Sequence, residues 1–149
     1  MKTTIPADRI AWLASTPIAR GGHASLKAGA CAMEMVAHLA GEPHSASPPC
    51  ASRAITQFVI GLNDRWDDER RQQLKAYIPQ LVGTNTGVED ERRRAYILAD
   101  WTSRECVPMR LDLRGKTEWA DRFRALAPIV DASSAAAANA LAVYARAES

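Results

Sequence analysis

The sequence predicts an all-α fold, a single-domain helical bundle of five to six principal helices. Apolar side chains recur at helical spacing along most of the chain, and prolines and glycines separate the periodic stretches. Only residues 109–115 alternate as a strand would, and a lone strand has no partner. With 149 residues, 47% of them hydrophobic, the chain suits one domain over residues 1–149. Residues 1–26 are expected to form a less regular N-terminal segment, with a short helix near residues 10–13.

Two helices form the first predicted hairpin. The first has one apolar face and stops at Gly41, because glycine commonly ends helices. Ser47 caps the second, with Pro48 and Pro49 in its first turn. Since the linker between them is short, the two helices are expected to be neighbours in space. Their apolar faces comprise Ala28, Cys31, Ala32, Met35, Val36 and Leu39, then Ile55, Phe58, Val59, Leu62 and Trp66.

The third helix spans residues 67–82, and Pro79 is expected to kink or end it before its last turn. Thr86 and Glu89 have the spacing of a capping box, which opens a long fourth helix running to about Cys106. The buried stripe of this helix is expected to hold Ala95, Leu98, Ala99, Trp101, Thr102 and Cys106.

The C-terminal part continues the helical pattern. Pro108 is expected to close the fourth helix, and residues 109–115 to form an extended connection. A short helix around Trp119 ends at Pro128, and Asp131 caps a final alanine-rich helix.

Composition favours a soluble cytoplasmic protein. The net charge of +2 requires neither nucleic acid nor an anionic membrane as a partner. No apolar run approaches the roughly 20 residues that span a bilayer, and Pro6, Asp8 and Arg9 interrupt any signal peptide. Three cysteines, an odd number, fit reduced thiols better than a disulfide framework.

A metal site is considered first, because residues 28–50 hold two of the three cysteines and two of the three histidines. Cys31, His38, His44 and Cys50 are the residue types that bind zinc. On a helix, however, Cys31 and His38 lie two turns and roughly 10 Å apart, and no C-x-x-C or H-x-x-x-H spacing is present. We therefore predict no metal and no cofactor, with Cys31 packed in the core.

Thiol chemistry is the second possibility, centred on Cys50 and His44. In the first turn of a helix, free backbone amides and the nearby Arg53 would lower the pKa of Cys50, and His44 could act as its base. No third partner or nucleophile motif is evident.

Acid and base groups also recur nearby. Glu34 and His38, at i and i+4, are expected on the helix face opposite the apolar stripe, as an acid/base pair or as a solvated ion pair. An enzyme becomes the leading interpretation if Glu34, Glu42, His44 and Cys50 line one cleft. It fails if these side chains point separately to solvent.

Nucleic-acid binding is an alternative that rests on the C-terminal half. Arginine is well suited to phosphate, and basic residues outnumber acidic ones in residues 92–124. The cluster comprises Arg92, Arg93, Arg94, Arg104, Arg110, Arg114, Lys116, Arg122 and Arg124. Whether these arginines share one face decides between a binding surface and an ordinary solvated one.

The run GACAMEMVAHLAGEPHS, followed by PPC, AITQFVIGLND and YIPQLVGT, resembles a family of uncharacterised bacterial and mobile-element proteins with the pattern G-x-C-x-M-E-x-V-A-x-L-A-G-E. The resemblance covers residues 29–101 and implies bacterial or phage origin without implying an activity. Its motif positions here are Cys31, Glu34, Gly41, Glu42, Ser45 and Cys50.

The absence of an active-site signature favours a binding protein over an enzyme. We expect a small regulatory protein that acts through protein–protein interaction, with tryptophans such as Trp12, Trp66 and Trp119 as possible anchors. An inhibitor of a host defence complex, encoded by a phage or mobile element, would fit this description.

Overall fold

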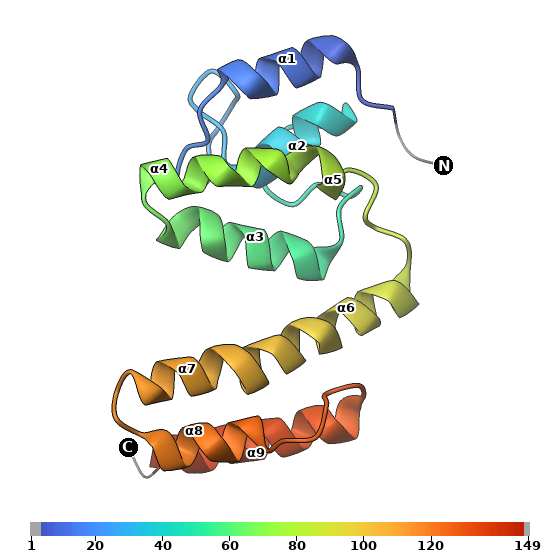
Figure 1. Ribbon diagram of the computed structural model, residues 1–149. Helices are drawn as coiled ribbons and strands as arrows, with labels where there is room; N and C mark the ends of the chain where they lie inside the picture. Colours follow the sequence, from blue (N-terminus) through green and yellow to red (C-terminus); the bar gives the residue numbers. More distant parts are fainter. Residues whose placement is uncertain (1–3, 148–149) are drawn as a thin grey trace. The chain divides into compact units, whose positions relative to one another are not determined.

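The computed structural model describes residues 4–147, which form helices and no strand, so the all-α prediction is confirmed (Figure 1). Contacts divide the chain into two compact units, one ending at Glu91 and the other beginning at Arg92. None of the helices in the described part is long and apolar enough to cross a membrane.

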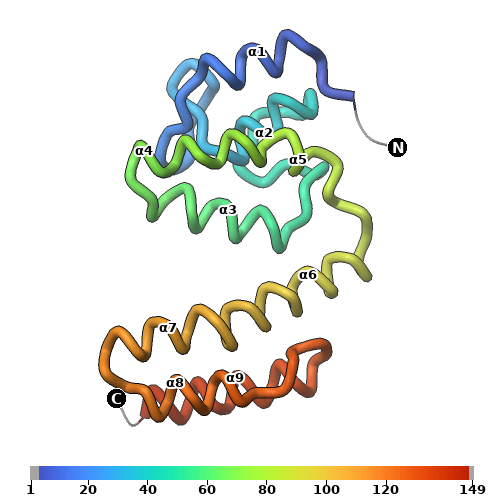
Figure 2. Tube along the Cα trace, viewed as in Figure 1, coloured from blue at the N-terminus to red at the C-terminus, as the bar shows by residue number. Residues whose placement is uncertain are grey.

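The N-terminal unit is built around one central helix (Figure 2). Seven of the nine residues of α2 are buried, and α2 contacts α1, α3 and α5. The expectation of a single apolar face was therefore wrong, since this helix is covered on nearly every side. The helices of this unit are α1 (Ala7–Ser15), α2 (Ala32–Ala40), α3 (Arg53–Arg65), α4 (Asp68–Arg71), the 3-10 helix η1 (Gln72–Ala76) and α5 (Ile78–Leu81).

Helix boundaries in this unit follow from capping chemistry. Gly41 adopts the left-handed conformation, with φ of 78°, and ends α2 as expected. The next helix begins later than expected, because the side chain of Ser52, not that of Ser47, accepts a hydrogen bond from the amide of Ile55. Pro48 and Pro49 consequently lie in the preceding turns and not in a helix.

The C-terminal unit holds two shorter helices and all of one long helical stretch except its first four residues, 88–91. The stretch consists of α6, a π-turn and α7 in unbroken succession, and α8 contacts both α7 and α9. Counting this stretch as one helix and leaving the 3-10 helix aside gives eight α-helices among the described residues, more than the five or six expected. The elements are α6 (Val88–Trp101), the π-turn η2 (Thr102–Cys106), α7 (Val107–Asp112), α8 (Thr117–Arg124) and α9 (Ala132–Ala147).

Pro108 does not close the long helix. The amide of Val107 donates to the carbonyl of Thr102, five residues back, so the helix widens by one residue just before the proline. Pro108 then occupies the first turn of α7, where a missing backbone N–H is tolerated. Residues 109–112 are therefore helical, and the expected extended connection was wrong.

Candidate functional site

The carboxylate of Glu34 is the centre of a buried polar cluster at the start of α2. Only 2% of Glu34 is exposed, so the expected position on the solvent face was wrong. Oε2 accepts a hydrogen bond from the amide of Cys31 at 2.8 Å, and Oε1 accepts one from the amide of His23 at 2.7 Å. A buried carboxylate requires such donors, because its desolvation is otherwise costly.

Two histidines approach the same carboxylate from the two loops that flank α2. His23 Nδ1 lies 2.9 Å from Oε2 of Glu34, and His44 Nε2 lies 3.4 Å from Oε1. His44 Nε2 also lies 2.8 Å from the carbonyl oxygen of His23, close enough for a hydrogen bond. We call Glu34, His23 and His44 the Glu34 cluster; it fastens both loops to the N-terminus of α2.

Electrostatics in the cluster favour a charged carboxylate and a neutral thiol. Burial raises the pKa of Glu34, but hydrogen bonds from His23 and Cys31 outweigh burial and leave the pKa below its ordinary value. The neighbouring Cys31 is buried, and burial together with the Glu34 charge raises its pKa to about 11. Cys31 is therefore protonated at neutral pH, as befits a packing residue.

Cys50 belongs to a different pair. It precedes α3 and does not lie in its first turn, so the helix terminus does not favour its thiolate. Burial raises the pKa of Cys50, and the adjacent carboxylate of Glu42 raises it further. Although both residues lie in the described chain, His44 and Cys50 form no hydrogen bond with each other. These surroundings do not favour the thiolate that the thiol alternative required.

The four residues whose convergence would indicate an enzyme thus form two separate groups. Glu34 binds His44, whereas Glu42 faces Cys50. His38 joins neither group, because its ring packs against Trp12 with the ring centroids 4.3 Å apart. Burial lowers the pKa of His38, and the charge of Arg9 lowers it further.

The geometry of the Glu34 cluster is that of a structural hydrogen-bond network, which holds two loops against α2. Each oxygen of Glu34 already faces a backbone amide and a histidine, which leaves the carboxylate little capacity to act on a substrate. Within residues 4–147, no group of three or more His, Cys, Asp or Glu side chains is arranged to hold a metal ion. Sequence reasoning missed His23, because it lies in an irregular segment eleven residues before Glu34.

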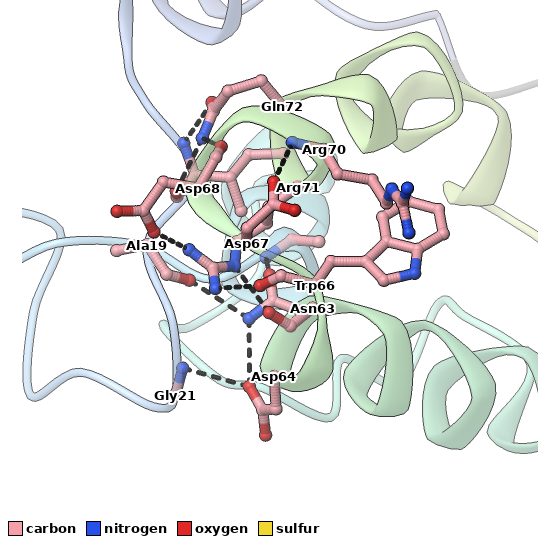
Figure 3. A network of polar contacts seen from close by, with 12 residues as sticks. Ala19, Gly21, Asn63, Asp64, Trp66, Asp67, Asp68, Arg70, Arg71 and Gln72 are labelled. Carbon is pink, nitrogen blue, oxygen red and sulfur yellow. Dashed lines mark hydrogen bonds and ion pairs between the residues drawn. The ribbon is translucent and has the colours of Figure 1, made fainter.

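A second buried network, also missed from the sequence, joins α3 to α4 (Figure 3). The Asn63 side chain accepts a hydrogen bond from the amide of Ala32 and donates one to the carbonyl of Ala19, both at 3.1 Å. Buried Arg71 donates to the carbonyl oxygens of Asn63 and Trp66. The Asn63 bonds tie the loop before α2 and the start of α2 to α3, and the Arg71 bonds tie α4 to the end of α3.

The C-terminal arginines do not all share one face. Arg92, Arg93 and Arg94 are consecutive on α6, so their side chains project about 100° apart around the helix. Arg104 pairs with Asp100 at 3.2 Å, and Arg124 pairs with Asp112 and Asp121. Arg122 stacks on the ring of Trp119, 4.2 Å from its centroid.

Exposed apolar side chains gather instead along the long helical stretch of the same unit. Ile97 is 63% exposed, Trp101 48%, Met109 59% and Leu113 82%. The expected burial of Trp101 was wrong, and none of the residues of α6 is buried. We call Ile97, Trp101, Met109 and Leu113 the α6–α7 face.

Comparison with protein-family models, with curated proteins and with solved structures gives no match to this chain.

Proposed function

We propose that this protein binds another protein through the α6–α7 face and does not catalyse a reaction. The observation that carries the proposal is the exposure of Ile97, Trp101, Met109 and Leu113, four large apolar side chains on one helical stretch. Contiguous apolar surface of this kind is typical of interaction sites. Tryptophan and methionine are also enriched where interfaces bury most surface.

The spacing of these residues supports one continuous face. Ile97, Trp101, Glu105, Met109 and Leu113 follow one another at intervals of four, and each is exposed. On a regular α-helix that interval drifts by about 40° per step. The π-turn rotates less per residue and counteracts this drift between Trp101 and Met109. The face therefore extends across the turn, with the acidic Glu105 at its middle.

The small core of the C-terminal unit also supports a partner. Its buried apolar residues are few, namely Pro108, Ala120, Phe123, Ile129 and Ala138. A unit of fewer than 60 residues gains little stability from so few buried side chains. Covering the α6–α7 face would add apolar burial at about 25 cal/mol per Å². An inhibitor of a host defence complex is one kind of protein that would act in this way.

Site-specific photocross-linking tests the proposal. A benzophenone amino acid replaces Trp101 on the α6–α7 face, and in a matched control it replaces Tyr77, which is exposed in the N-terminal unit. We expect irradiation in the native host to attach one recurrent protein at position 101 and none at position 77. Mass spectrometry identifies the adduct.

A double variant tests whether the apolar side chains of the α6–α7 face make the interaction. Replacing Ile97 and Met109 by glutamate should abolish the cross-link at position 101 while leaving the helical content unchanged. Equal labelling at positions 77 and 101 would contradict the proposal, as would an adduct that nuclease treatment removes. The latter result would favour the nucleic-acid alternative.

A further inference from the structure

A pocket of about 300 Å³ lies within the C-terminal unit, among η2, α7, α8 and α9. Leu111, Phe123 and Ala142 contribute apolar surface to it. Phe123 is buried and provides a fixed wall, because its position is set by packing and not by a ligand. The volume is at the lower end of the range for small-molecule sites, enough for a short acyl chain or an aromatic ring system.

Three arginines surround this apolar space. Arg110 and Arg114 come from α7 and the turn after it, and Arg146 comes from α9. The described residues that line the pocket include no carboxylate, and none of the three arginines forms an ion pair with a described acidic side chain. Arg104 and Arg124, in the same unit, are both paired with aspartates. Within residues 4–147, therefore, no ion pair neutralises the positive charge at the pocket.

An apolar pocket edged by three arginines indicates the class of ligand that it can bind. Guanidinium groups bind carboxylate and phosphate oxygens through paired hydrogen bonds, and an apolar pocket binds an apolar body. We propose that the pocket binds a small amphipathic anion, a free molecule with an apolar body and one carboxylate or phosphate head. The site is distinct from the α6–α7 face, so it can be occupied whether or not that face binds a partner.

Decanoate is the probe for a titration followed by two-dimensional NMR of the isotopically labelled full chain. We expect saturable shifts of the amides of Leu111, Phe123 and Ala142. Acetate provides the head without the apolar body, and decylammonium provides the same body with the opposite charge. Neither compound should produce these shifts at the same concentration. Equal binding of decylammonium would overturn the proposal, as would shifts confined to the α6–α7 face.

Two variants separate charge from shape. R110Q combined with R146Q should weaken decanoate binding about ten-fold or more, because each charged hydrogen-bond donor contributes strongly. A142L keeps the charges and fills the pocket, and it should also abolish binding. R122Q, which removes the stacked arginine of the same unit, is the control and should bind as the unmodified chain does. Unchanged affinity in folded R110Q/R146Q and A142L would refute the site.

A vesicle sedimentation experiment distinguishes a free ligand from a lipid in a membrane. Phosphatidylglycerol vesicles present the same class of head group on a surface. We expect the protein to remain in the supernatant when these vesicles are sedimented. Cosedimentation that R110Q/R146Q abolishes would assign the arginines to a membrane surface and overturn the proposal of a free ligand.

Discussion

Gly29 lies directly against the imidazole ring of His23. A Cβ atom at Gly29 would lie 2.6 Å from His23 Cδ2 and 2.8 Å from Nε2. The backbone of Gly29 also has a φ of +136°, which side-chain-bearing residues rarely adopt. Glycine is thus required here on two independent grounds, and the Glu34 cluster depends on it.

We therefore expect Gly29→Ala to destabilise the protein by more than backbone strain alone. Gly87→Ala is the matched control, because Gly87 has a φ of +110° but nothing within 4 Å of its Cβ position. Strain of this kind costs about 1–3 kcal/mol. The Gly29 variant should lose at least about 1 kcal/mol more, measured from urea unfolding midpoints. Equal losses of unfolding free energy in the two variants would show that the His23 ring moves aside at no measurable cost.

Removing the charge of Glu34 should destabilise the N-terminal unit. In Glu34→Gln an amide nitrogen replaces one carboxylate oxygen and faces N–H donors instead of accepting from them. We expect a loss of about 2–3 kcal/mol in the free energy of unfolding. Glu42→Gln is the control, because buried Oε2 of Glu42 makes no hydrogen bond within the described chain. A loss in the control as large as in Glu34→Gln would contradict this assignment.

Lowering the pH should remove the contribution of the Glu34 carboxylate to the free energy of unfolding. Its pKa in the folded protein lies below the ordinary value of 4.5, so the stabilisation is complete above pH 4.5. It declines as the pH falls from there through the folded pKa. Unfolding free energies measured between pH 7 and 3 should therefore converge for the unmodified protein and Glu34→Gln. A constant difference across this range would refute the prediction.

Subtraction of the two curves is necessary, because other carboxylates also titrate in this range. Hydrogen bonds from the amides of Ile129 and Ser134 lower the pKa values of Asp100 and Asp131 respectively. Their contributions are the same in both proteins and cancel in the difference.

Arg71 is expected to matter far more than its neighbour Arg70. Arg71→Met keeps much of the side-chain volume but leaves the carbonyl oxygens of buried Asn63 and partly buried Trp66 without their donor. We expect a loss of about 2–4 kcal/mol in unfolding free energy. Arg70→Met alters an exposed side chain and should change stability by less than about 0.5 kcal/mol. Chemical denaturation of both variants checks the contrast.

Cys31 should resist alkylation in the folded protein. Its thiol is buried and its pKa is about 11, so little thiolate is present or accessible at pH 8. Iodoacetamide followed by peptide mapping should leave Cys31 unmodified until urea unfolds the chain. Rapid modification of Cys31 under native conditions would contradict the buried position.

Local signals in the sequence account for much of the fold and little of the site. Gly41 ends α2, and Asp131 caps α9 by accepting a hydrogen bond from the amide of Ser134 at 2.8 Å, both as expected. These outcomes depend on neighbours within a few residues, which a sequence displays directly. The passage of the long helix through Pro108 was not foreseen, because a π-turn has no strong local signature.

Helix formation and capping are governed by contacts three or four residues apart, so the sequence alone predicts a helical chain and the points where several helices stop. Which polar groups are buried depends on how the helices and loops pack together. Glu34 has the local pattern of a solvated residue, yet it is enclosed because the two loops that flank α2 fold back and bring His23 and His44 to it. Trp101 has the pattern of a core residue, yet 48% of it is exposed in the folded chain. Burial depends on contacts between distant segments, and these contacts are not encoded in the spacing along any one helix.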